Sequence, residues 1–224
     1  IEKILLIEKR NIWALSSLIK ICESEKDWDL AAQFSKRLQK ITGKKNVDNF
    51  AQFEVYKGLE NLDKGLFNEA KIFFQKAIKI SPEYSLSYRY LGNIFEQTRD
   101  LVNALKNWEL YALKDIKNSY TVFPKIESAL FDLGRYSEVE KFYRRILEME
   151  KGNINAIIRL SNVLEEKGER VDAITLIDNF LIDNKSDTRT DLMKLKLLIP
   201  TSTPLELVQQ LDNIMEKLLN RDDD

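Results

Sequence analysis

The chain has no histidine and only one cysteine, Cys22, among its 224 residues. A single thiol cannot form a disulfide within the chain, and it cannot supply the ligand set of a histidine- or cysteine-based metal site. Without histidine, the usual acid–base and triad machinery of enzymes is also missing. We therefore expect no metal ion, no cofactor and no catalysis.

Glycine and proline are scarce as well, with seven and four residues respectively. Few residues of these types favour long regular helices over a turn-rich β fold. Neither sign of charge dominates, because 35 lysine and arginine residues nearly balance 36 aspartate and glutamate residues, which gives a net charge of -1. This balance argues against general attraction to nucleic acid. No apolar run reaches the roughly 18 residues of a transmembrane helix, so we expect no membrane insertion.

The first residue is Ile1 rather than methionine, which predicts that the sequence is a fragment of a longer protein. An anchor or a targeting segment could therefore have preceded it. The low cysteine content is compatible with a cytoplasmic protein.

Two distant stretches of the chain are similar to each other. ILLIEKRNIWAL at 4–15 and ILEMEKGNINAI at 146–157 share seven identities in twelve aligned positions. Long-range self-similarity of this kind indicates an array of repeated units. We interpret both stretches as the junction between one unit and the next.

The clearest unit is 51–84, and its small and aromatic residues fall at regular offsets. The residues at positions 8, 15, 20, 24 and 27 of this unit are Gly58, Gly65, Ala70, Phe74 and Ala77. This pattern resembles the tetratricopeptide repeat, a helix–turn–helix unit of about 34 residues. The resemblance implies an all-α, right-handed α-solenoid, a superhelix of antiparallel helix pairs.

Small and apolar residues recur at the same offsets along the chain and divide it into units. Residues 1–11 are interpreted as the tail helix of a truncated preceding repeat. The five predicted repeats are 12–45, 51–84, 85–119, 120–153 and 154–187, with a short insertion at 46–50. Residues 188–224 are interpreted as a degenerate capping helix pair and a frayed C-terminus.

Residue type at several positions predicts local geometry. Close approach of paired helices is predicted where the residue is small, at Gly58, Gly92 and Ser161. Left-handed glycines are expected to end first helices at Gly65, Gly134 and Gly168. We also expect Cys22 and the three tryptophans, Trp13, Trp28 and Trp108, to pack in the core.

Helix starts are predicted from capping residues. Asp27 and Asp100 stand where they can cap second helices. Pro124 is tolerable near a helix start if Thr121 is the cap. Thr203 with Glu206 predicts a capping box for the last helix.

The resemblance to tetratricopeptide repeats also implies a binding surface. In that family the first helix of each pair lines a concave groove. The side chains placed there are Arg89, Tyr90, Asn93, Lys125, Ser128, Asn155, Arg159 and Asn162. The predicted function is a scaffold or adaptor that binds a partner peptide in this groove. An ordinary solvated helix face is the alternative.

Some tetratricopeptide domains clamp the C-terminal carboxylate of a peptide with a Lys/Arg/Asn set. Arg89 and Asn93 match the first half of that clamp, whereas Lys125 and Asn155 depart from it. The hypothesis is therefore a groove for an acidic or amide-rich segment rather than a carboxylate clamp.

Residues 11–45, followed by the unit at 51, resemble the array of bacterial lipopolysaccharide assembly protein B. This resemblance implies an adaptor in envelope assembly at the cytoplasmic face of the inner membrane. The N-terminal anchor and the four-cysteine metal site of that family are absent from this sequence.

Three alternatives remain open. The chain could be the regulatory arm of a larger enzyme whose catalytic domain lies outside it. A helical-repeat RNA binder is disfavoured by the net charge of -1. A homodimer could also form through an exposed N-terminal edge of four residues, Ile1, Ile4, Leu5 and Ile7.

Overall fold

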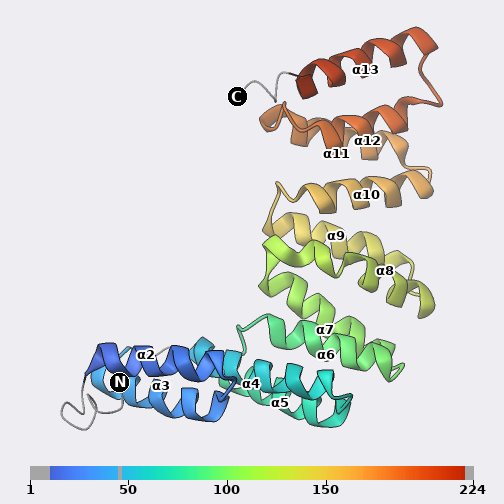
Figure 1. Ribbon diagram of the computed structural model, residues 1–224. Coiled ribbons are helices and arrows are strands. Elements are labelled where there is room, and N and C mark those ends of the chain that lie inside the picture. The colour runs from blue at the N-terminus through green and yellow to red at the C-terminus, as the bar shows by residue number, and fades with distance from the viewer. Residues whose placement is uncertain (1–10, 45–46, 220–224) are drawn as a thin grey trace. The chain divides into compact units, whose positions relative to one another are not determined.

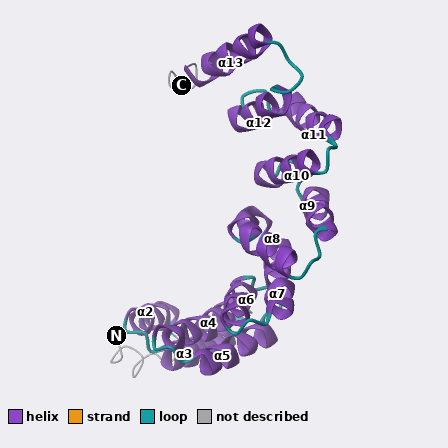
Figure 2. Cartoon of the chain, turned by 90° about the vertical axis from the view of Figure 1, so that its right-hand side faces the viewer, coloured by secondary structure: helices purple, strands orange, loops and turns teal. Residues whose placement is uncertain are grey.

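The computed structural model describes residues 11–44 and 47–219. Within these ranges every regular element is helical and no strand occurs (Figure 2). The chain divides into two compact units, Ile1–Asp115 and Ile116–Asp224. The predicted all-α fold of consecutive helix pairs is confirmed in each unit.

The first unit contains three antiparallel helix pairs (Figure 1). They are α2 (Ile12–Ser24) with α3 (Trp28–Thr42), α4 (Val47–Asp63) with α5 (Phe67–Ile80), and α6 (Leu86–Gln97) with α7 (Leu101–Lys114). Each pair buries the apolar side of both helices, as amphipathic helices require.

The second unit starts with a 3₁₀-helix and continues as α-helices. Its elements are η1 (Ile116–Thr121), α8 (Phe123–Asp132), α9 (Ser137–Met149), α10 (Ile154–Glu166), α11 (Arg170–Asp183), α12 (Thr188–Leu198) and α13 (Pro204–Leu219). Figure 2 shows α8, α10 and α12 on one side of this unit and α9 and α11 on the other. First helices thus form one layer, and second helices form another.

Most predicted helix ends are confirmed. Gly65, Gly134 and Gly168 have φ angles of 73°, 69° and 81°, in the left-handed region. The side chains of the two predicted aspartate caps accept hydrogen bonds at the starts of α3 and α7. The last helix has its capping box, since the Thr203 backbone N–H donates to the Glu206 carboxylate over 2.8 Å.

Small residues at position 8 allow close helix contact, as predicted. A Cβ atom added to Gly58 would lie 2.5 Å from the Phe74 ring, and one added to Gly92 would lie 2.5 Å from the Trp108 ring. Trp108 and Cys22 are buried as expected. These glycines are therefore required by the aromatic side chains that face them.

Three expectations are wrong. Trp13 is 64% exposed and does not pack in the core. Thr121 does not cap α8, because its hydroxyl donates to the Asn118 carbonyl instead, and Pro124 is tolerated within the first turn. Residues 47–50 belong to helix α4 rather than to an insertion. The predicted N-terminal edge (Ile1, Ile4, Leu5, Ile7) lies outside the described residues.

Candidate functional site

In the first unit, the predicted site residues lie on α6 and contact aromatic rings. The Arg89 guanidinium carbon is 5.8 Å from the ring centroid of Tyr90 and 5.9 Å from that of Tyr111. Tyr90 in turn stacks on Phe74, with centroids 5.3 Å apart. Both rings provide a flat surface on which a guanidinium group is stabilised.

Asn93 has a structural partner in the same unit. Its Oδ1 accepts a hydrogen bond from Trp108 Nε1 over 3.2 Å. Trp108 is buried, so its indole N–H needs such a partner. Asn93 therefore orients the largest side chain between α6 and α7.

In the second unit, three side chains join α8, α9 and α10. The Tyr143 hydroxyl donates to Glu127 Oε1, and Arg159 Nη1 donates to Glu127 Oε2, both over 2.6 Å. The Glu127 side chain is 18% exposed, whereas that of Arg159 is 40% exposed. A half-buried carboxylate thus holds an arginine whose guanidinium still reaches the surface.

The Tyr143 hydroxyl acts only as a donor. Burial raises the pKa of Tyr143 far above its usual value, and the hydrogen bond to Glu127 raises it further. The phenol therefore stays protonated at neutral and moderately alkaline pH and keeps its proton for the hydrogen bond to Glu127.

The remaining predicted residues on α8 and α10 differ in their exposure to solvent. Asn155 lies one turn before Arg159 on α10 and is half-buried, as is Lys125 on α8. Ser128 on α8 is exposed. Their helices belong to the same layer of the second unit (Figure 2). The layer therefore offers hydroxyl, amide, ammonium and guanidinium groups.

Asn162 is bound within the protein. Lys196 of α12 donates to Asn162 Oδ1 over 3.0 Å and pairs with Glu165 over 2.7 Å. Consecutive first helices α10 and α12 are linked by this contact. The predicted basic surface is thus partly neutralised, since both Arg159 and Lys196 have carboxylate partners.

Sequence reasoning missed Glu127, although a signal for it exists. Glu127 occupies position 8 of its repeat, where three of the other repeats have a small residue, Gly58, Gly92 or Ser161. Position 24 of this repeat is Tyr143 rather than an apolar aromatic residue. A glutamate opposite a tyrosine at these two positions predicts their hydrogen bond.

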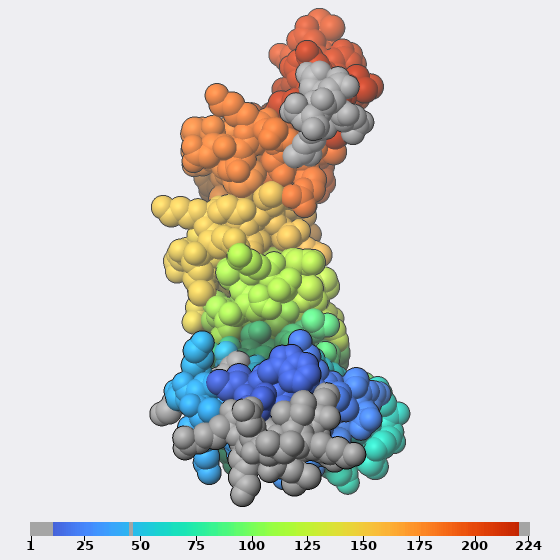
Figure 3. All heavy atoms as spheres, turned by 60° about the vertical axis from the view of Figure 1, so that its left-hand side comes forward, coloured from blue at the N-terminus to red at the C-terminus, as the bar shows by residue number. Residues whose placement is uncertain are grey.

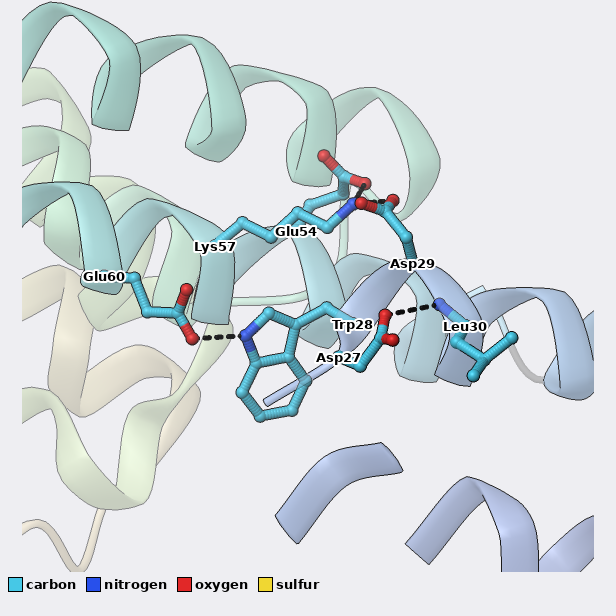
Figure 4. Close-up of polar contacts among 7 residues, drawn as sticks. All are labelled: Asp27, Trp28, Asp29, Leu30, Glu54, Lys57 and Glu60. Atoms are coloured by element: carbon cyan, nitrogen blue, oxygen red, sulfur yellow. Dashed lines mark hydrogen bonds and ion pairs between the residues drawn. The ribbon is translucent and has the colours of Figure 1, made fainter. Parts of the chain in front are cut away.

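Another polar cluster in the first unit connects α3 to α4 (Figure 4). Trp28 Nε1 donates to Glu60 over 2.6 Å, and the indole stacks on Tyr56 with centroids 4.6 Å apart. Beside it, Lys57 pairs with Asp29. These contacts position one helix pair on the next, and we assign them a structural role.

No helix within 11–44 and 47–219 is long and apolar enough to cross a bilayer. Over the same ranges, no group of three His, Cys, Asp or Glu side chains could hold a metal ion.

Replacing Tyr143 by phenylalanine should remove its hydroxyl and leave the Glu127–Arg159 pair in place. We expect the free energy of unfolding to fall by about 1 kcal/mol, because a half-buried carboxylate oxygen loses one donor. Tyr136→Phe is the matched control, since Tyr136 is 60% exposed. Urea titrations that show equal stability for both variants would contradict the described hydrogen bond.

Comparison with known proteins places the fold. A family model of the tetratricopeptide repeat matches residues 57–84. The solved structure of MamA is similar, with a TM-score of 0.50, 17% identity, and coverage of 75% of this chain and 97% of that chain. MamA from Desulfovibrio magneticus RS-1 has a TM-score of 0.50 at 10% identity, covering 77% and 97%. At these identities the likeness concerns the fold alone.

No curated protein sequence matches the chain. The resemblance to lipopolysaccharide assembly protein B therefore stays a prediction.

Proposed function

From the match of residues 57–84 to the tetratricopeptide repeat and from the fold of helix pairs, we propose that the chain binds a segment of a partner protein on the layer of α8 and α10. Helix-pair repeats of this kind serve in general as protein-interaction scaffolds. The observation that carries the proposal is the Arg159 guanidinium, which is held by Glu127 and still 40% exposed.

Arg159 suits recognition because it is already oriented. Its Nη1 donates to Glu127, and a guanidinium has further N–H donors in a fixed plane. An arginine already fixed by a carboxylate loses little side-chain freedom when a ligand binds. The remaining donors can bind a carbonyl or carboxylate oxygen.

The neighbouring side chains define the chemistry of the ligand. Asn155 can donate to and accept from a backbone amide, and Ser128 offers an exposed hydroxyl. Lys125, half-buried on α8, adds positive charge to the same layer. These groups favour an acidic or amide-rich segment over an apolar one.

Within the first unit, we propose Arg89 and Tyr90 as contact residues. They form a cation–aromatic surface on α6, and Asn93 supports it by holding Trp108. Asn162 has the corresponding supporting role in the second unit, where it accepts from Lys196.

Finer predictions accompany this proposal. We propose that the chain has no catalytic activity of its own and that its array follows the repeat division given above. A role in bacterial envelope assembly, in the cytoplasm or at the cytoplasmic face of the inner membrane, rests on the resemblance of residues 11–45. Recovery of lipopolysaccharide-assembly proteins with the chain would support that role.

The proposal predicts a charge-reversal effect that affinity capture can measure. Proteins bound by the wild type are compared with those bound by a Lys125→Glu, Arg159→Glu double variant. We expect the variant to lose the partner by about tenfold or more, because two donor groups become carboxylates.

The control is a Lys141→Glu, Arg145→Glu double variant on α9, where both residues are exposed. It makes the same change of charge in the other layer of the unit and should retain the partner. Circular dichroism of both variants checks that the helices are intact. Equal loss from both variants, or retention by both, would refute a site on α8 and α10.

A further inference from the structure

A second surface lies on the last helix, α13, and has different chemistry. Four apolar residues at spacings of three and four, Val208, Leu211, Met215 and Leu218, fall on one helical face, which we call the α13 stripe. Their exposed fractions are between 42% and 54%. Of the α13 residues, only Ile214 is buried.

Helix α13 lies at the edge of the described part of its unit. Figures 1 and 2 both show α13 beside α12, with no described helix on its other side. In the space-filling view, α13 (red) lies beyond the orange helices of the same unit (Figure 3). A row of exposed apolar side chains of this kind marks a surface for another molecule.

The charge along the stripe restricts what can cover it. Asp212 and Glu216 follow Val208 at intervals of four, so they form the edge of the stripe. Both are exposed, and neither has an ion-pair partner among residues 11–44 and 47–219. The only lysine of α13, Lys217, pairs with Asp191 of α12 over 2.5 Å. The edge is therefore acidic.

Two other binding partners, a second copy of the chain and an anionic membrane, match this acidic edge poorly. In an antiparallel pairing of two copies about the midpoint of the stripe, Leu211 of one copy would lie opposite Met215 of the other. The acidic edges of the two copies would then lie on the same side of the pair, and like charges repel. An anionic membrane surface would likewise repel Asp212 and Glu216.

We propose that the α13 stripe binds an amphipathic helix of another protein whose apolar face is flanked by lysine or arginine. Apolar side chains at spacings of three and four match the anchors of a helix lying along a groove or face. Basic flanks would pair with Asp212 and Glu216 and set the orientation of the bound helix. This surface is independent of the proposed site on α8 and α10.

Two synthetic helical peptides test this proposal on the full chain. Each is about 18 residues long, or roughly five helical turns, with leucines at the a and d heptad positions. One carries lysine at the flanking e and g positions and the other carries glutamate. Fluorescence anisotropy should show that the lysine peptide binds at least about tenfold more tightly.

Variants locate the binding. Leu211→Asp with Met215→Asp should weaken the lysine peptide about 30-fold, the loss expected for removing two central anchors. Val171→Asp on α11 is the control, because Val171 lies outside the stripe and is 76% exposed. This variant should bind the peptide as tightly as the wild type does. Asp212→Lys with Glu216→Lys should reverse the preference toward the glutamate peptide.

Several results would overturn the proposal. A basic helix is not the partner of the stripe if the lysine peptide fails to bind at about 100 μM. The same conclusion follows if both peptides bind equally tightly. A dimer in light scattering that Leu211→Asp, Met215→Asp dissociates would assign the stripe to a second copy. Binding to vesicles of anionic lipid that the same variant abolishes would assign it to a membrane. Variants at Lys125 and Arg159 should leave peptide binding unchanged, which keeps this test separate from the first proposal.

Discussion

Replacing Trp108 by alanine is expected to lower the free energy of unfolding by about 3–5 kcal/mol. Trp108 is 1% exposed and fills the space between α6 and α7, where Gly92 leaves room for its ring. Its removal leaves a large cavity and deprives Asn93 Oδ1 of the indole donor. The loss thus combines apolar burial with a broken hydrogen bond.

Far-UV circular dichroism in urea measures this effect without depending on tryptophan fluorescence. Trp13→Ala is the matched control, since the same residue type is 64% exposed there. That variant should differ from the wild type by less than about 0.5 kcal/mol. Similar losses from both variants would contradict the description of Trp108 as a core residue.

Replacing Gly92 by alanine should destabilise the first unit by about 1–3 kcal/mol, because the added methyl overlaps the indole of Trp108. Its Cβ would lie 2.5 Å from Trp108 Cδ1 and Nε1. Alanine is the better helix former by about 1 kcal/mol, so propensity alone predicts the opposite sign. A loss of stability would therefore show that the overlap with Trp108 outweighs helix propensity, and a gain would show the opposite.

Gly152→Ala provides the comparison, because a Cβ there meets nothing within 4 Å. We expect that variant to be neutral or up to about 1 kcal/mol more stable. In the Gly92→Ala, Trp108→Ala double variant the added methyl no longer overlaps a ring, so the losses should not add. Stabilisation by Gly92→Ala, or additive losses in the double variant, would refute the close contact.

Features that depend on residue type at a fixed offset could be predicted from the sequence. A left-handed turn requires glycine, so Gly65, Gly134 and Gly168 identified the ends of first helices. The close contact of Gly92 with Trp108 follows from a small residue at position 8 and a large one at position 24. Such pairs are set within one repeat and need no knowledge of distant contacts.

Features that depend on neighbouring repeats could not be predicted in the same way. The Glu127–Arg159 pair joins two repeats, and its formation depends on the distance between α8 and α10. The exposure of Trp13 likewise depends on what packs beside α2 rather than on its own helix. The pattern of α13 predicted an amphipathic helix but not which part of its apolar side would remain uncovered.

Site-specific photocrosslinking most directly tests the proposal that a partner segment binds on the layer of first helices. A benzophenone amino acid replaces Ser128, which is exposed on α8, or Lys141, which is exposed on α9. The two positions differ in layer but belong to the same unit. With the captured partner present, we expect crosslinks from position 128 and none from position 141. Crosslinks from position 141 alone would place the partner on the second helices and contradict the proposed site.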